Sequence, residues 1–97
     1  MPRGYIIGEI EITNPEGYER YRSQSPKLIE QFGGRYLVRG GEAQLLEGTG
    51  AVKRAVVIEF DSYERALEFY NAPVYRAILP HRLENATTPR LICVAGV

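Results

Sequence analysis

Four segments of the chain alternate between apolar and polar residues, the pattern of β-strands that bury one face. They cover residues 4–13, 35–39, 54–60 and 90–95. In the first segment Ile6, Ile10 and Ile12 fall on one side of the strand, and Glu9 and Glu11 fall on the other. The sequence therefore predicts four strands, each with a side that faces a core.

Two helical regions separate these strands. The first starts at Asn14-Pro15-Glu16, which supplies a capping residue, a proline suited to the first turn and an acidic side chain. Gly33-Gly34 ends this region, because glycine adopts the left-handed conformation that follows many helices. Ser62 caps the second region, which breaks at Asn71-Ala72-Pro73 and starts again at the proline.

Two further prolines lie within the helical regions. Pro26 lies in the first region, and Pro80 lies near the end of the second. A proline cannot donate a hydrogen bond to the carbonyl four residues earlier, and its ring crowds the preceding turn. We therefore expect each of them to mark a kink or an end of a helix.

The segment after residue 39 has two interpretations. Gly40-Gly41 separates the strand at 35–39 from a second apolar stretch, residues 43–46. The glycine pair is either a tight hairpin turn or a bulge that bends one long strand. The sequence leaves both open, and residues 47–50 are expected to form a loop.

The order of elements predicts an α+β fold: a ferredoxin-like antiparallel sheet with two helical segments on one face. One face of the sheet is apolar throughout, and the helices are expected to cover it. Its predicted residues are Ile6, Ile10, Ile12, Tyr36, Val38, Val56, Ile58, Phe60, Ile92 and Val94.

The opposite face of the sheet is only half apolar, and no element remains to cover it. Its predicted residues are Tyr5, Ile7, Glu9, Glu11, Arg35, Leu37, Arg39, Val57, Glu59, Leu91 and Cys93. Exposed apolar side chains forgo stabilisation of about 25 cal/mol per Å² of surface. A second copy of the chain is the expected partner, so we predict a homodimer.

Several segments resemble the domain of unknown function 1330 family. They are residues 32–41 (FGGRYLVRGG), 46–48 (LEG), 57–60 (VIEF) and 66–70 (ALEFY). The resemblance implies a dimeric α+β barrel, in which two ferredoxin-like sheets face each other. The chain departs from the family after Tyr70, because Ala72-Pro73-Val74-Tyr75 stands where the family usually has Ser-Pro-Glu-Tyr. Ala72 cannot cap a helix, so either Asn71 caps it or the cap is lost.

Composition narrows the class of protein. The 97 residues carry 12 basic and 12 acidic side chains, so neither nucleic acid nor an anionic membrane is an expected partner. A single cysteine excludes an internal disulfide and a cysteine-cluster metal site. One histidine gives no cluster of metal ligands, so no metal site is predicted. Related dimeric barrels that degrade haem pair a helical histidine with a tryptophan, and the chain has no tryptophan, so the resemblance implies no haem and no cofactor is predicted. The chain has no apolar run of membrane-spanning length and no signal-peptide pattern, so we expect a cytoplasmic protein.

One candidate site lies on the helical side of the sheet. His81, the only histidine, is a candidate general base because its ordinary pKa is near neutrality. An alternative interpretation is a solvated side chain at a helix end. The candidate substrate-binding residues are Tyr18, Tyr21, Tyr70, Tyr75 and Arg82. Phenols and a fixed cation around apolar walls are typical of small-molecule pockets.

The second sheet face offers an alternative site. Glu59 could act as a base there, with Arg35 and Arg39 binding an anion. The same residues could instead form an ion-paired network that fixes the register of a dimer.

These observations predict a small homodimeric domain that binds a small, partly apolar or anionic molecule between helices and sheet. Cofactor-free oxygenase or isomerase activity is implied only by the resemblance to related dimeric barrels. The alternative is a ligand-sensing or structural dimerisation module without catalysis.

Overall fold

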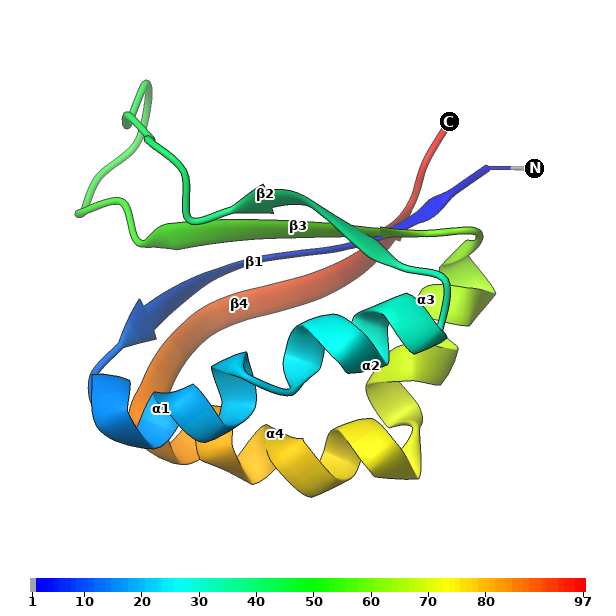
Figure 1. Ribbon diagram of the computed structural model, residues 1–97. Coiled ribbons are helices and arrows are strands. Elements are labelled where there is room, and N and C mark those ends of the chain that lie inside the picture. The colour runs from blue at the N-terminus through cyan, green and yellow to red at the C-terminus, as the bar shows by residue number, and fades with distance from the viewer. Residues whose placement is uncertain (1) are drawn as a thin grey trace.

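The alternating segments pair into one antiparallel sheet, and the helices all lie on one of its faces (Figure 1). The computed structural model describes residues 2–97. The strands are β1 (Gly4–Ile12), β2 (Arg35–Arg39), β3 (Arg54–Phe60) and β4 (Ala86–Ala95), in the order β2-β3-β1-β4 across the sheet. The helices are α1 (Pro15–Arg22), α2 (Ser25–Gln31), α3 (Tyr63–Asn71) and α4 (Pro73–Asn85). The predicted ferredoxin-like α+β fold is confirmed.

The core fills the space between the helices and the covered face of the sheet. Phe60 and Phe69 lie at its centre, with 0% and 2% of their surfaces exposed and their ring centroids 5.2 Å apart. The other buried apolar side chains include Ile6, Ile10, Ile29, Val56, Ile58, Ile78 and Leu79. The apolar residues of β1 and β3 that were predicted to face the helices, such as Ile6, Ile10 and Val56, are therefore buried in the core.

The two prolines behave differently. The first helical region divides into α1 and α2, and Pro26 lies in the first turn of α2, where its missing N–H has no helical acceptor. Helix α4 instead continues through Pro80 as far as Asn85, so Pro80 does not end the helix, and the other expected outcome, a kink at Pro80, stays a prediction. Leu79 and Arg82, which flank Pro80 along the helix, are both buried.

The helix caps follow the sequence only in part. The Ser62 hydroxyl accepts from the Arg65 amide at 3.0 Å, which confirms the predicted cap of α3. Asn14 occupies the N-cap position of α1, but its side chain donates to Asn85 Oδ1 at 2.9 Å instead of capping. Helix α4 has no side-chain cap, because Asn71 donates to the Leu67 carbonyl.

The segment after β2 is neither a tight hairpin nor a continued strand. Strand β2 ends at Arg39, Gly40 adopts a φ of +67°, and residues 41–53 form no strand before β3 begins. The apolar stretch at 43–46 therefore neither continues β2 nor forms the second strand of a hairpin, so both interpretations are wrong. The loop projects away from the sheet and pairs with none of its strands (Figure 1). Leu46 is consequently 85% exposed.

A bulge in β2 reverses the predicted direction of two side chains. Tyr36 pairs with Ile58 and Val38 pairs with Val57, so Leu37 is an extra residue in the strand. One extra residue moves every later side chain to the other face. Val38 consequently lies on the uncovered face, and Arg39 lies on the face that the helices cover.

A second irregularity lies in β4, which begins four residues earlier than predicted. Thr88 and Pro89 lie opposite the single residue Ile10, because Glu9 pairs with Arg90 and Glu11 pairs with Thr87. A proline is tolerated here because β4 is an edge strand.

The face assignment of β4 is also the reverse of the prediction. Cys93 pairs with Ile6 and Leu91 pairs with Gly8, so these two side chains face the core. Ile92 and Val94 are 42% and 40% exposed on the uncovered face. All four residues are apolar, so the sequence pattern is equally consistent with Leu91 and Cys93 facing the core and with Ile92 and Val94 facing it. Pairing with β1 decides between them.

The Gly34→Ala variant tests how tightly the core is packed. A Cβ atom at Gly34 would lie 2.5 Å from Cε1 of Phe60, a ring that is fully buried and has no room to move. We expect a loss of about 1–3 kcal/mol in the free energy of unfolding, measured by urea denaturation. The Gly41→Ala control meets nothing within 4 Å and leaves stability unchanged. Equal stability of the two variants would contradict this packing.

Candidate ligand site between the helices and the sheet

A cavity lies between the covered face of the sheet and helices α1, α2, α3 and α4. Ile6, Ile10, Val56 and Ile58 form its floor on the sheet. Its tyrosine lining comprises Tyr18, Tyr21, Tyr36, Tyr70 and Tyr75. The free volume is about 30 Å³ in this conformation, which holds only about two or three water molecules. A larger ligand therefore enters only if half-buried side chains at the mouth, such as Tyr36 and Tyr70, move aside.

Two buried phenols meet at the inner end of the cavity. The hydroxyls of Tyr21 and Tyr75 are 2.6 Å apart and form a hydrogen bond. Burial, followed by the proximity of Tyr75, raises the pKa of Tyr21 far above its ordinary value. The Tyr21 phenol therefore stays protonated, and this pair can donate a hydrogen bond to an oxyanion.

Arg82 places a positive charge beside these phenols. Only 2% of Arg82 is exposed, and its Nη1 donates to the Thr88 hydroxyl at 2.6 Å. Its guanidinium carbon lies 5.7 Å from the centroid of the Tyr21 ring. Burial lowers the pKa of Arg82, but Tyr75 and Tyr21 raise it by more, so the guanidinium is charged.

No carboxylate of residues 2–97 forms a salt bridge with Arg82. The polar groups around the guanidinium are instead the hydroxyls of Thr88, Tyr21 and Tyr75. A buried charge without an opposite charge is unfavourable, because desolvation is not compensated by a nearby counter-ion. Its position at the end of a cavity makes Arg82 a candidate group for binding an anion.

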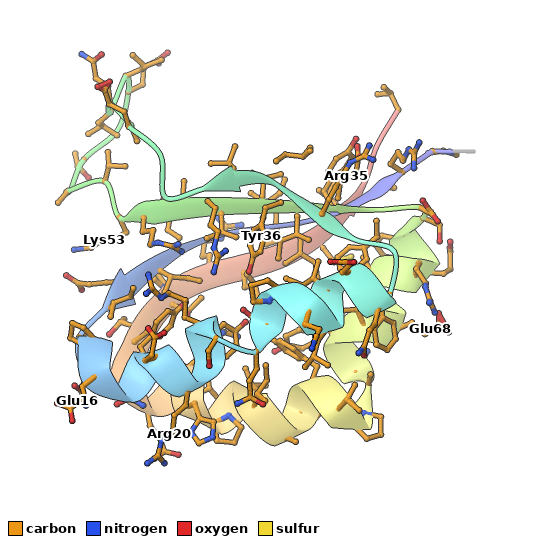
Figure 2. All side chains as sticks on the ribbon, in the orientation of Figure 1. Glu16, Arg20, Arg35, Tyr36, Lys53 and Glu68 are labelled. Carbon is orange, nitrogen blue, oxygen red and sulfur yellow. The ribbon has the colours of Figure 1, made fainter. Side chains whose placement is uncertain are left out.

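The charged side chains of the lining are all cationic. It contains Arg39, Arg54 and Arg82, and no aspartate, glutamate, histidine, lysine or cysteine among the described residues. Arg39 is exposed and Arg54 is half-buried, which places them at the mouth. The Arg39 guanidinium carbon lies 4.5 Å above the centroid of the Tyr36 ring. Figure 2 shows Tyr36 extending from β2 toward the helices.

His81 does not line this cavity. It lies in a polar surface groove of about 470 Å³ between α1 and α4, with Glu16, Arg20 and Glu84. The buried positions of α4 include residues 78, 79 and 82, and one residue along a helix turns the side chain by about 100°. The structure therefore brings together Tyr18, Tyr21, Tyr70, Tyr75 and Arg82 and leaves His81 outside their group.

The alternative site is divided between the two faces of the sheet. Glu59 forms an ion pair with Arg35 on the uncovered face and accepts from the Tyr5 hydroxyl at 2.9 Å. Tyr5 and then Arg35 lower the pKa of Glu59, although its burial acts in the opposite direction. A lowered pKa makes Glu59 a weaker base. Arg39 belongs to the cavity on the other face, so the three residues predicted together are not one site.

Sequence reasoning missed two residues of this site. Arg54 lines the cavity and could have been found, because it continues the alternation of Val56, Ile58 and Phe60 on β3. Thr88 does not line the cavity but accepts from Arg82, and it could not have been found, since it lies in the irregular part of β4.

Solved structures share this fold at low sequence identity. The RPA0582 protein of unknown function from Rhodopseudomonas palustris has a TM-score of 0.74 and 22% identity, covering 99% of this chain and 83% of that chain. SnoaB, a cofactor-independent oxygenase from Streptomyces nogalater, has a TM-score of 0.64 and 8% identity, covering 100% and 95%. An uncharacterized NIPSNAP domain protein from Burkholderia xenovorans has a TM-score of 0.57 and 17% identity, covering 100% and 93%. At these identities the likeness shows the fold alone.

Other comparisons bear on the class of the chain. No curated protein matches it in sequence. Within residues 2–97, no helix has both the length and the apolar character needed to cross a membrane. The family model described as Domain of unknown function (DUF1330) matches residues 3–97, nearly the whole chain, in agreement with the resemblance of its Gly-Gly-Arg and Ile-Glu-Phe segments. The chain therefore belongs to the DUF1330 family.

Proposed function

We propose that this protein binds a small, partly apolar anion in the cavity between its helices and sheet. The observation that carries the proposal is the buried guanidinium of Arg82, which has no salt-bridge partner among residues 2–97 and lies beside the two buried, hydrogen-bonded phenols of Tyr21 and Tyr75. A carboxylate or enolate oxygen would accept hydrogen bonds from these groups and supply the missing negative charge.

The walls of the cavity suit an apolar or aromatic ligand body once Tyr36 and Tyr70 move aside to admit it. The floor is aliphatic, and the opposite wall carries the rings of Tyr18, Tyr21 and Tyr75. Such a combination of apolar walls with a few oriented polar groups supports binding of a small molecule.

Catalysis of the oxygenase or isomerase type needs a further condition. Arg82 and the phenols would stabilise an oxyanion that forms during a reaction. However, the described lining contains no carboxylate and no histidine to remove a proton. Turnover would therefore require a substrate that enters already ionised, such as an acidic enol or phenol. Ligand binding without catalysis, as in a sensor, is the function that the lining supports best.

We also propose that the protein is a homodimer that buries the uncovered sheet face. Ile7, Leu37, Val38, Ile92 and Val94 are each 36% to 50% exposed on or beside this face. An open groove of about 540 Å³ lies on this face, with a mostly apolar lining that includes Ile7, Val57 and Ile92. A contiguous apolar surface of this kind favours a partner, and a symmetric second copy matches it in chemistry.

Binding of benzoate tests the role of Arg82. We expect calorimetry or NMR titration to show that wild-type protein binds benzoate more tightly than benzamide, which has a similar shape but no charge. Arg82→Gln should weaken benzoate binding by about ten- to a hundredfold, because a charge-assisted hydrogen bond contributes about 1.5–3 kcal/mol. Tyr75→Phe should weaken benzoate binding by a smaller factor, because it removes one hydroxyl and keeps the packed ring.

Arg20→Gln is the matched control, because Arg20 is exposed on α1 and points away from the sheet (Figure 2). It should bind benzoate as wild-type protein does. A folded Arg82→Gln variant with wild-type affinity for benzoate would show that the anion site lies elsewhere.

Val57→Asp tests the assembly. Val57 is half-buried on β3 beside the uncovered apolar groove, so an aspartate there would carry an unpaired charge into the proposed interface. We expect light scattering to show a dimer for wild-type protein and a dissociation constant raised at least about tenfold for the variant. Val74→Asp, at a position 49% exposed on α4, should remain a dimer. A monomeric wild-type protein at micromolar concentration would disprove the proposed assembly.

A further inference from the structure

The cavity has a second positively charged end, which the role of Arg82 does not explain. Arg39 and Arg54 lie at its mouth and face the helices, one from β2 and one from β3. Arg39 reaches this face only because of the bulge at Leu37. Arg54 is placed there by the ordinary alternation of β3.

The two mouth arginines are neighbours. Arg39 pairs with Val56, which is two residues from Arg54 on the same face of β3. The Arg54 side chain also passes over Gly40, because a Cβ atom at Gly40 would lie 2.6 Å from its Nε and 2.8 Å from its Cγ. Both side chains therefore come together beside the end of β2.

Neither mouth arginine has an acidic partner among residues 2–97, since no salt bridge there includes Arg39 or Arg54. The contact of Arg39 is with the face of the Tyr36 ring, which leaves the edge of its guanidinium available as a donor. Two adjacent cations repel each other, and an oxyanion between them would relieve this repulsion through charge-assisted hydrogen bonds.

Tyr18 connects the mouth with the inner end of the cavity. Burial raises its pKa, whereas the positive charges of Arg54 and Arg82 both act to lower it. Tyr18 therefore lies within the electrostatic reach of both ends. The cavity has a cation at each end, and its aliphatic floor and its phenol rings lie between them.

We propose that the ligand is a small dianion with an oxyanion at each end of an apolar or aromatic body. One oxyanion binds Arg82, Tyr21 and Tyr75, and the other binds Arg39 and Arg54. This inference rests on the proposed anion site at Arg82 and adds a requirement for a second charge. An unsaturated or aromatic dicarboxylic acid has this chemistry.

Terephthalate and its monomethyl ester are suitable probes, because they share one ring and one carboxylate and differ in the second charge. We expect calorimetry to show that wild-type protein binds terephthalate at least about tenfold more tightly than the monoester. The double variant Arg39→Gln/Arg54→Gln should bind both probes with equal affinity. The double variant Arg39→Lys/Arg54→Lys keeps both charges and should retain a preference for terephthalate.

Arg20→Gln again serves as the control for a general loss of positive charge, and thermal melting establishes that each variant is folded. Equal binding of the two probes by wild-type protein would overturn the second site. A preference for terephthalate that survives in the double glutamine variant would also overturn it. If the monoester still binds and needs Arg82 in either case, the proposed anion site stands and only the dianion requirement fails. Failure of both probes and of benzoate would overturn both proposals.

Discussion

The buried guanidinium of Arg82 imposes the main physical constraint on the helical side of this protein. Its charge is out of contact with bulk water, and the groups that surround it are the hydroxyls of Thr88, Tyr21 and Tyr75. Helix α4 supplies Arg82 and Tyr75, β4 supplies Thr88, and α1 supplies Tyr21. The contact thus ties two helices to the edge of the sheet. Hydroxyls solvate a cation without neutralising it, so the charge remains available to a ligand.

Two strand irregularities determine what reaches the cavity. The bulge at Leu37 turns Arg39 toward the helices, and the irregularity at Thr88 and Pro89 brings the Thr88 hydroxyl to Arg82. Bulges commonly redirect side chains in this way near functional sites. Here they add positive charge at the mouth and a neutral acceptor at the inner end. Both effects follow from a shift of one residue in the strand pairing.

The uncovered sheet face combines apolar side chains with an ion pair. Glu59, with Arg35 and Tyr5, lies on the same face as exposed Ile7 and Val94. In a homodimer this polar group would be surrounded by apolar contacts and would help to fix the relative position of the two sheets. The anion cavity lies on the other side of the sheet. Assembly and ligand binding would therefore use opposite faces of the same four strands.

The sequence by itself determined the order of strands and helices, the ferredoxin-like class and the family. These depend on local signals such as the alternation of Ile6 and Ile10, the cap at Ser62 and the glycine pair at 33–34. The convergence of the tyrosines and Arg82 was also predictable, because helical spacing puts Tyr75 and Arg82 on one stripe of the second helical region.

Only the tertiary structure decided the face of each residue where the local pattern was ambiguous. Leu91 and Ile92 are equally apolar, and pairing with Gly8 rather than hydrophobicity turns Leu91 inward. Arg39 and Thr88 acquire their positions from the bulges, and His81 is excluded by the rotation of α4. The physical reason is that strand register and helix rotation are set by contacts between elements distant in sequence. A pattern read along a single segment contains no information about those contacts.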